Sequence, residues 1–190
     1  MRHTKLHAKR LVGTLLLALA SAACSQGEES APAQQQEVVD VEKLEHVVDL
    51  QATGLAVPPQ GGEEQLDVPF GSRMEAAEAT LAGVLGDKLA SATNAECPAG
   101  PVESSSYEGL TLNFQDGGFV GWMAEAPYLP RESRAQLLAS DTVTLVEGST
   151  LGEEFVIGNP DGLSISGLFD AVGDDAKVSR MWAGVNCIFR

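Results

Sequence analysis

The chain has 190 residues, of which 12 are Lys or Arg and 27 are Asp or Glu, so its formal net charge is −15. The first 23 residues hold four basic residues and no acidic one. This leaves 8 basic and 27 acidic residues, a net charge of −19, for residues 24–190. Such a charge argues against a nucleic-acid-binding protein, because neutralising phosphates requires a surface of Lys and Arg. The length fits one domain with a tail, and a hydrophobic content of 44% is enough for a core.

Residues 1–23 have the pattern of a secretory signal peptide. A basic segment precedes an apolar run of ten residues, 11–20, and small residues then lead up to Cys24. Ten residues span about 15 Å as a helix, whereas the hydrocarbon core of a bilayer is about 30 Å thick. We therefore expect cleavage of this segment and no transmembrane anchor within it.

The sequence Ser21-Ala22-Ala23-Cys24 resembles the lipobox of bacterial lipoproteins. In that family the cysteine becomes the lipidated first residue of the mature chain, which implies that Cys24 carries fatty acids such as palmitate. Ser21 stands where the family usually has a large aliphatic residue, and an ordinary signal-peptide cleavage near Ala23 is the alternative. Ser25 stands where an Asp retains lipoproteins at the inner membrane. The resemblance therefore implies a place in the cell envelope, on the periplasmic face of the outer membrane if the host has one.

Residues 24–46 are interpreted as a flexible tether behind the lipid anchor. Residues 25–36 contain no large apolar side chain, so their burial cannot offset the entropy lost on ordering. Residues 37–50 fit both a helical stripe and an alternating strand. We expect a strand over residues 47–57, slipped at Gly54, and a single domain over residues 47–190.

The first half of this domain, residues 66–125, is predicted to be a helix followed by antiparallel strands. Ser72 and Glu75 form the pattern of a capping box at the start of a helix over residues 72–86. Asp116-Gly117-Gly118 is typical of a tight hairpin. The predicted strands are 101–107, 110–114 and 119–123.

The second half, residues 126–190, shows the same order of elements. Pro130 is placed near the start of a short helix over residues 130–138. The strands expected after it are 142–146, 154–157, 164–169 and 177–182. The predicted fold class is therefore α+β, with two tandem helix-plus-antiparallel-strand repeats in one compact domain. The alternative is a chance likeness between hairpins that both have alternating patterns.

These patterns resemble two known groups of proteins. A helix start followed by a strand meander in a lipid-anchored chain is similar to the tandem fold of beta-lactamase inhibitor protein and to BamE-type lipoproteins. Residues 96–101, 149–155 and 182–187 resemble segments of poorly characterised small bacterial lipoproteins, over residues 57–190 in total. Some members carry the label aspartate-semialdehyde dehydrogenase. That label is not supported here, because no Gly-rich turn for a dinucleotide opens a helix.

Two cysteines, Cys97 and Cys187, remain besides Cys24. In a secreted chain the simplest expectation is one disulfide between them. A metal-binding or nucleophilic role for one of the thiols is the alternative.

The sequence suggests no catalytic, cofactor or metal site. His46 is the only histidine of the mature chain and lies in the tether, away from any nucleophile it could activate. Oxygen ligands for Ca²⁺ could come from residues 159–161 or 170–175, but Asp and Asn are also common in turns for backbone reasons. We therefore expect a protein that is not an enzyme.

Aromatic residues are the remaining candidates for a binding surface. Trp122 and Trp182 fit either a sheet core or an interface, and Tyr107 and Tyr128 stand beside predicted turns, where exposure is expected. The predicted function is a lipid-anchored binding module for an envelope protein, attached to the membrane through its lipid. The alternatives are a secreted protein that inhibits an enzyme through an acidic sheet, and an enzyme of unrecognised chemistry.

Overall fold

The described part of the chain begins just after the predicted tether. The computed structural model describes residues 48–59, 64–159 and 161–189, and all of these belong to one compact unit. The predicted signal peptide, the lipidation site Cys24, the tether and His46 lie outside the described residues. The statements below concern the described residues alone.

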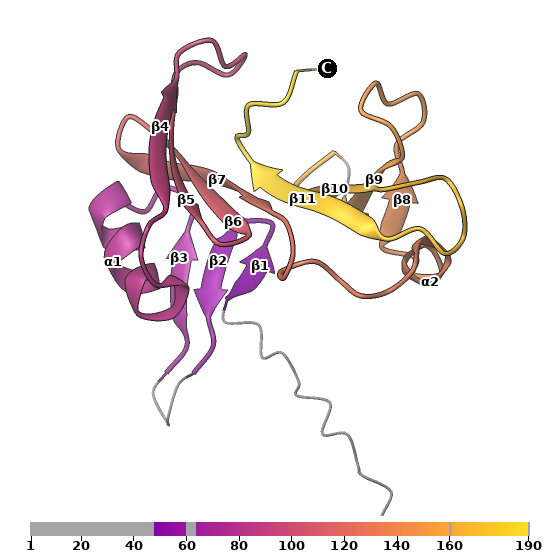
Figure 1. The fold of residues 1–190 in the computed structure, drawn as a ribbon, viewed down its shortest axis with the longest axis horizontal. Coiled ribbons are helices and arrows are strands. Elements are labelled where there is room, and N and C mark those ends of the chain that lie inside the picture. The colour runs from indigo at the N-terminus through magenta and orange to yellow at the C-terminus, as the bar shows by residue number, and fades with distance from the viewer. Residues whose placement is uncertain (1–47, 60–63, 160, 190) are drawn as a thin grey trace, which may run out of the picture. The chain divides into compact units, whose positions relative to one another are not determined.

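Strands dominate these residues, and only two helices accompany them (Figure 1). The elements in chain order are β1 (Asp49–Gln51), β2 (Gly54–Val57), β3 (Leu66–Pro69), α1 (Met74–Leu85), β4 (Ala90–Asn94), β5 (Val102–Tyr107), β6 (Leu110–Gln115), β7 (Gly118–Ala124), α2 (Arg134–Leu138), β8 (Val143–Leu145), β9 (Glu154–Gly158), β10 (Ser164–Phe169) and β11 (Val178–Gly184).

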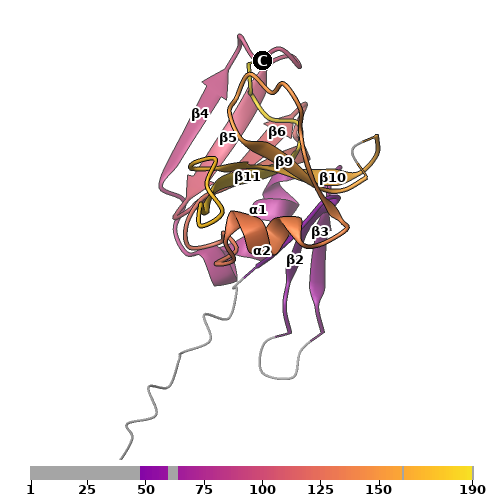
Figure 2. The ribbon, with the colours of Figure 1, turned by 90° about the vertical axis from the view of Figure 1, so that its right-hand side faces the viewer.

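The strands form two antiparallel sheets (Figures 1 and 2). The large sheet has eight strands in the order β4-β5-β6-β7-β11-β10-β9-β8, so the last strands of the two halves, β7 and β11, meet in its middle. The small sheet has the order β1-β2-β3, which makes β1 one of its edges. Within each half of the large sheet, strands that follow one another in sequence are hydrogen-bonded neighbours. The ladder between β7 and β11 joins the two halves.

The hairpin between β6 and β7 follows the sequence signal that predicted it. Asp116 and Gly117 have φ values of 50° and 73°. A two-residue hairpin loop of the favoured type needs positive φ at both central positions, and Asp-Gly satisfies that requirement at low steric cost. The predicted turn is confirmed.

The core lies between the large sheet and the elements that precede it in sequence. Register pairs Leu112 with Trp122 and Trp122 with Ala183, which puts three buried side chains on one face of the large sheet. Helix α1 contributes Ala77 and Leu81 to the same core. Every residue of β2 is buried as well. The first half of the sheet is therefore covered by both α1 and the small sheet.

The strand predicted over residues 47–57 is two strands in the structure. Residues 52 and 53 form a turn, and β2 folds back on β1 with Gln51 opposite Gly54. Gly54 has a φ of 150°, and a side chain there would lie 2.8 Å from the Cα of Pro69 on β3. The glycine marks a close approach between neighbouring strands, where a slip in one strand was expected.

The predicted α+β class is corrected to a mostly β structure. Helix α1 has 12 residues, but α2 has only five and buries none of its side chains. Because α2 is little more than one turn, the second half is a sheet with a short helical segment, and the expected pair of equivalent helix-plus-strand repeats does not describe the fold.

The predicted capping box at α1 is also wrong. Arg73 is the N-cap and provides no side-chain cap, while the Ser72 hydroxyl donates to the Pro69 carbonyl at 2.7 Å. The Met74 N–H instead donates to the carbonyl of Gly117, in the hairpin loop before β7. A tertiary contact with the sheet therefore satisfies the first N–H of the helix. At α2, which begins at Arg134 and not near Pro130, Ser133 and Gln136 form the capping box.

Candidate functional site

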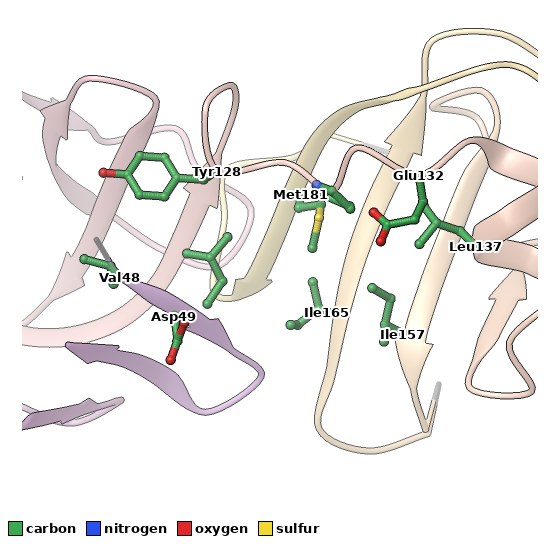
Figure 3. Close-up of a pocket in the computed structure, with 10 residues that line it drawn as sticks. Val48, Asp49, Tyr128, Glu132, Leu137, Ile157, Ile165 and Met181 are labelled. Atoms are coloured by element: carbon green, nitrogen blue, oxygen red, sulfur yellow. The ribbon is translucent and has the colours of Figure 1, made fainter. Parts of the chain in front are cut away.

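An open groove of about 480 Å³ lies beside the second half of the large sheet (Figure 3). Its residues come from β1 and the residue before it, from the chain between β7 and α2, from α2 and from three strands of the large sheet. They are Val48, Asp49, Leu50, Tyr128, Pro130, Glu132, Leu137, Ile157, Ile165 and Met181.

The floor of the groove is apolar. Ile157 on β9 lies directly opposite Ile165 on β10, and Met181 lies on the next strand, β11. Leu137 of α2 adds a further apolar side chain, and the two isoleucines and this leucine are all partly exposed. Over the first half, by contrast, Leu110 and Leu112 are fully buried. Partial exposure follows because the short α2 covers only part of the second half.

One wall of the groove is the edge strand β1. Val48, Asp49 and Leu50 all line the groove, and β1 pairs with β2 on its other side. The indole N–H of Trp122 donates to the carbonyl of Gln51 at 2.9 Å, which ties β1 to the large sheet. Trp122 is fully buried, so this hydrogen bond is protected from competing water.

The polar side chains of the groove are acidic or phenolic. Asp49 and Glu132 are exposed carboxylates, and Figure 3 shows them on opposite sides of the apolar floor. None of the ten lining residues is Lys or Arg. Burial raises the pKa of the Tyr128 hydroxyl above its usual value of 10, and the negative charge of Glu108 raises it further. The groove is therefore apolar at its centre and negative at its rim.

Only one of the four predicted interaction residues reaches this groove. Trp122, Trp182 and Tyr107 are buried, with exposed fractions of 0%, 6% and 6%, so they are not available to a partner. Tyr107 was expected to be exposed beside its turn, but it belongs to the core cluster that includes α1. Tyr128 lines the groove and is half-buried.

Sequence reasoning did not identify the apolar floor. Ile157 and Ile165 lie within strands that were predicted, and alternation along those strands indicates which residues share a face. The sequence contains one indication of an exposed floor: the predicted second helix is short. A short helix cannot cover the four strands that follow it. Which side chains remain exposed depends on where β1 lies, and β1 is more than 100 residues away in sequence.

Cys97 and Cys187 form a disulfide across a sequence separation of 90 residues, with their Cα atoms 5.0 Å apart. The bond ties the segment after β11 to the first half of the domain. Two contacts support the same connection. The Val185 N–H donates to the Val120 carbonyl at 2.8 Å, and the Asn113 amide donates to the Asn186 side chain at 2.8 Å. With both sulfurs bonded, neither thiol is available as a metal ligand or nucleophile.

A second group of polar side chains lies under α1. The buried Ser105 hydroxyl donates to Glu78 at 2.6 Å, and Lys88 forms an ion pair with the same carboxylate at 2.8 Å. Burial alone would raise the pKa of Glu78, but the hydrogen bonds from Lys88 and Ser105 and the charge of Lys88 outweigh it and hold the pKa below its usual value. Because Ser105 is 0% exposed, no substrate can reach it, and the cluster ties α1 to β5.

Asn159 and Asp170, whose side chains have oxygen atoms that could bind calcium, accept hydrogen bonds from the backbone of their own turns. The Asn159 side chain accepts from the Asp161 N–H at 3.0 Å, and Asp170 accepts from the Lys177 N–H at 2.9 Å. Within the described ranges, no group of three or more His, Cys, Asp or Glu side chains is arranged to hold a metal ion.

Neither helix in the described part of the chain has the length and apolarity to cross a bilayer. Comparison with protein-family models, with curated proteins and with solved structures finds no match to this chain.

Proposed function

We propose that this protein is a lipid-anchored component of the bacterial cell envelope that binds another protein through the groove beside β1. The observation that carries the proposal is the incompletely covered apolar floor, in which Ile157, Ile165 and Leu137 are partly exposed. Exposed apolar side chains gathered in a concavity are typical of binding surfaces. The small sheet covers the apolar face of the first half of the large sheet. At the groove, the corresponding face of the second half has no such cover from the described residues.

The envelope location is supported by the sequence of residues 1–24. Their signal-peptide pattern and lipobox-like cysteine favour export and lipidation, with outer-membrane sorting favoured by Ser25. A tether over residues 24–46 would separate the acidic domain from anionic headgroups, which repel it. We place the domain in the periplasm on these grounds.

A binding role is proposed in preference to a catalytic one because of the side chains in the groove. Its ten lining residues include no histidine, cysteine, serine or lysine that could act as a nucleophile or a base near neutral pH. The inhibitor alternative requires aromatic side chains presented on the sheet surface. The burial of Trp122, Trp182 and Tyr107 gives that alternative no support.

Crosslinking in intact cells, followed by capture from membranes, tests both parts of the proposal. The wild-type chain should fractionate with the membrane and capture a defined envelope protein, and Cys24→Ala should release the protein into the soluble fraction. Ile165→Glu places a charge on the partly exposed floor, and we expect it to abolish capture without unfolding the domain.

The matched control is Leu89→Glu, which changes an apolar side chain that is 70% exposed and outside the groove. Capture that survives Ile165→Glu, or that is lost equally in Leu89→Glu, would contradict a role for the groove. Membrane retention of Cys24→Ala would contradict the lipid anchor.

A further inference from the structure

We propose that the groove binds an extended segment of the partner protein as an additional strand beside β1, and that this segment carries alternating apolar and basic side chains. This inference rests on the proposed function and specifies how the groove recognises its partner. Three features of the groove support it: a strand edge that has no partner among the described residues, an apolar floor with a strand-like layout and an acidic rim.

The first feature is the edge of β1. Within the described residues, β1 pairs with β2 alone, and its opposite side borders the groove. In an antiparallel ladder, successive residues direct their N–H and C=O groups to alternate sides, so part of the β1 backbone points away from β2. An added strand would satisfy these groups and extend the order β1-β2-β3 by one position.

The second feature is the floor below that edge. The small sheet packs on the first half of the large sheet, and stacked sheets lie about 10 Å apart. A strand added next to β1 would continue this layer over Ile157, Ile165 and Met181. Because side chains of an extended segment alternate between faces, every second residue would contact the floor and should be apolar.

The third feature is charge. Asp49 lies on β1 and Glu132 lies across the floor from it, and no lining residue offers a positive charge. A segment with Lys or Arg at the positions facing away from the floor would place cations near both carboxylates. A second copy of this chain is a poor occupant, because it brings the same two carboxylates and a net charge of −19 from residues 24–190.

A synthetic peptide of ten residues, alternating valine and lysine, is a direct probe of this mode. Its binding to the purified Cys24→Ala chain can be followed by fluorescence anisotropy at low salt. Two matched peptides complete the set: one with glutamate in place of lysine, and one with backbone N-methyl groups along one edge, which remove hydrogen-bond donors. Neither peptide alters the fold of the protein.

We expect the valine–lysine peptide to bind and the glutamate peptide not to bind. N-methylation should weaken binding at least tenfold, since it removes donors from the added strand. The double variant Asp49→Asn, Glu132→Gln should weaken binding about three- to tenfold, as expected for two partly exposed ion pairs, with Glu96→Gln as an unaffected control outside the groove. Higher salt should weaken binding to the wild-type chain.

The outcomes separate this inference from the proposed function. Equal binding of the N-methylated peptide would overturn strand addition, and equal binding of the glutamate peptide would overturn the acidic selectivity. If no peptide binds but capture of the envelope protein still depends on Ile165, the groove is the binding site and strand addition is wrong. If capture does not depend on Ile165, the proposed function itself fails.

Discussion

Gly167 provides the most stringent test of how the second half is packed. It lies on β10, opposite Phe155 on β9. A Cβ at this position would lie closest to Cζ of the Phe155 ring, 2.7 Å from Cε1 and 3.0 Å from Cε2. Carbon atoms in ordinary contact are about 3.5–4.0 Å apart. In Gly167→Ala, the ring would therefore have to move by about 1 Å.

The surroundings of Phe155 oppose that movement. The ring is fully buried and packs on Phe169, with 4.5 Å between the ring centroids. Overpacking of this kind costs about 1–3 kcal/mol, and the entropy that alanine removes from the unfolded chain offsets about 0.4–1 kcal/mol of it. We expect a net loss of about 1–2 kcal/mol in the free energy of unfolding. For a domain of this size, that loss lowers Tm by about 3–7 °C.

Urea unfolding followed by tryptophan fluorescence measures the loss. Gly173→Ala is the matched control, because its Cβ meets no atom within 4 Å, and it should be neutral or slightly stabilising. Adding Phe155→Leu should make room for the new methyl group, so the double variant should be less destabilised than the sum of its single variants. An unchanged urea midpoint for Gly167→Ala, or additive losses in the double variant, would refute the packing argument.

Three further predictions concern the stability of the domain. Gly83→Ala should stabilise it by about 0.5–1 kcal/mol, because Gly83 lies within α1 and its Cβ would meet open space, and thermal unfolding would show the gain. Replacing both Cys97 and Cys187 with serine should lower the free energy of unfolding by about 4–5 kcal/mol, because the unfolded chain gains loop-closure entropy. Unfolding the wild-type chain in the presence of a reductant should show the same decrease. The ionised Glu78 carboxylate stabilises the folded state at pH values above its unfolded pKa of about 4.5, and this stabilisation is lost as the pH falls through its lowered folded pKa. The urea midpoint of Glu78→Gln should therefore decline less in acid than that of the wild-type chain. An unchanged decline would show that other carboxyl groups cause it.

Local signals predicted every strand of the large sheet except β4. The predicted strand over residues 110–114 corresponds to β6, and that over residues 164–169 matches β10. Residues 110–114 alternate apolar and polar side chains, residues 164–166 do the same, and glycine-containing turns lie nearby, so local sequence was enough to predict both strands. The Asp116-Gly117 turn is predictable for the same reason.

Elements that depend on distant contacts could not be predicted. Strand β4 has the sequence Ala-Ser-Ala-Thr-Asn and is exposed throughout, so it has neither apolar alternation nor a β-branched run, and its structure comes from pairing with β5. The start of α1 looked like a capping box at Ser72, but the carbonyl of Gly117 provides the cap. The groove combines residues from β1 with residues from β9 to β11, and no local pattern records that arrangement.

The disulfide also determines how the domain would respond to mechanical tension. When force is applied to the two ends of the chain, the Cys97–Cys187 bond transmits it, so the residues between the two cysteines are not extended. The contour length released on unfolding is therefore shorter by roughly 300 Å. Force spectroscopy would register that contour only after reduction. The floor of the groove lies in the shielded part, while β1 lies in the part that yields. Tension on the N-terminal side would therefore separate β1 from the groove, while the residues of the floor remain folded.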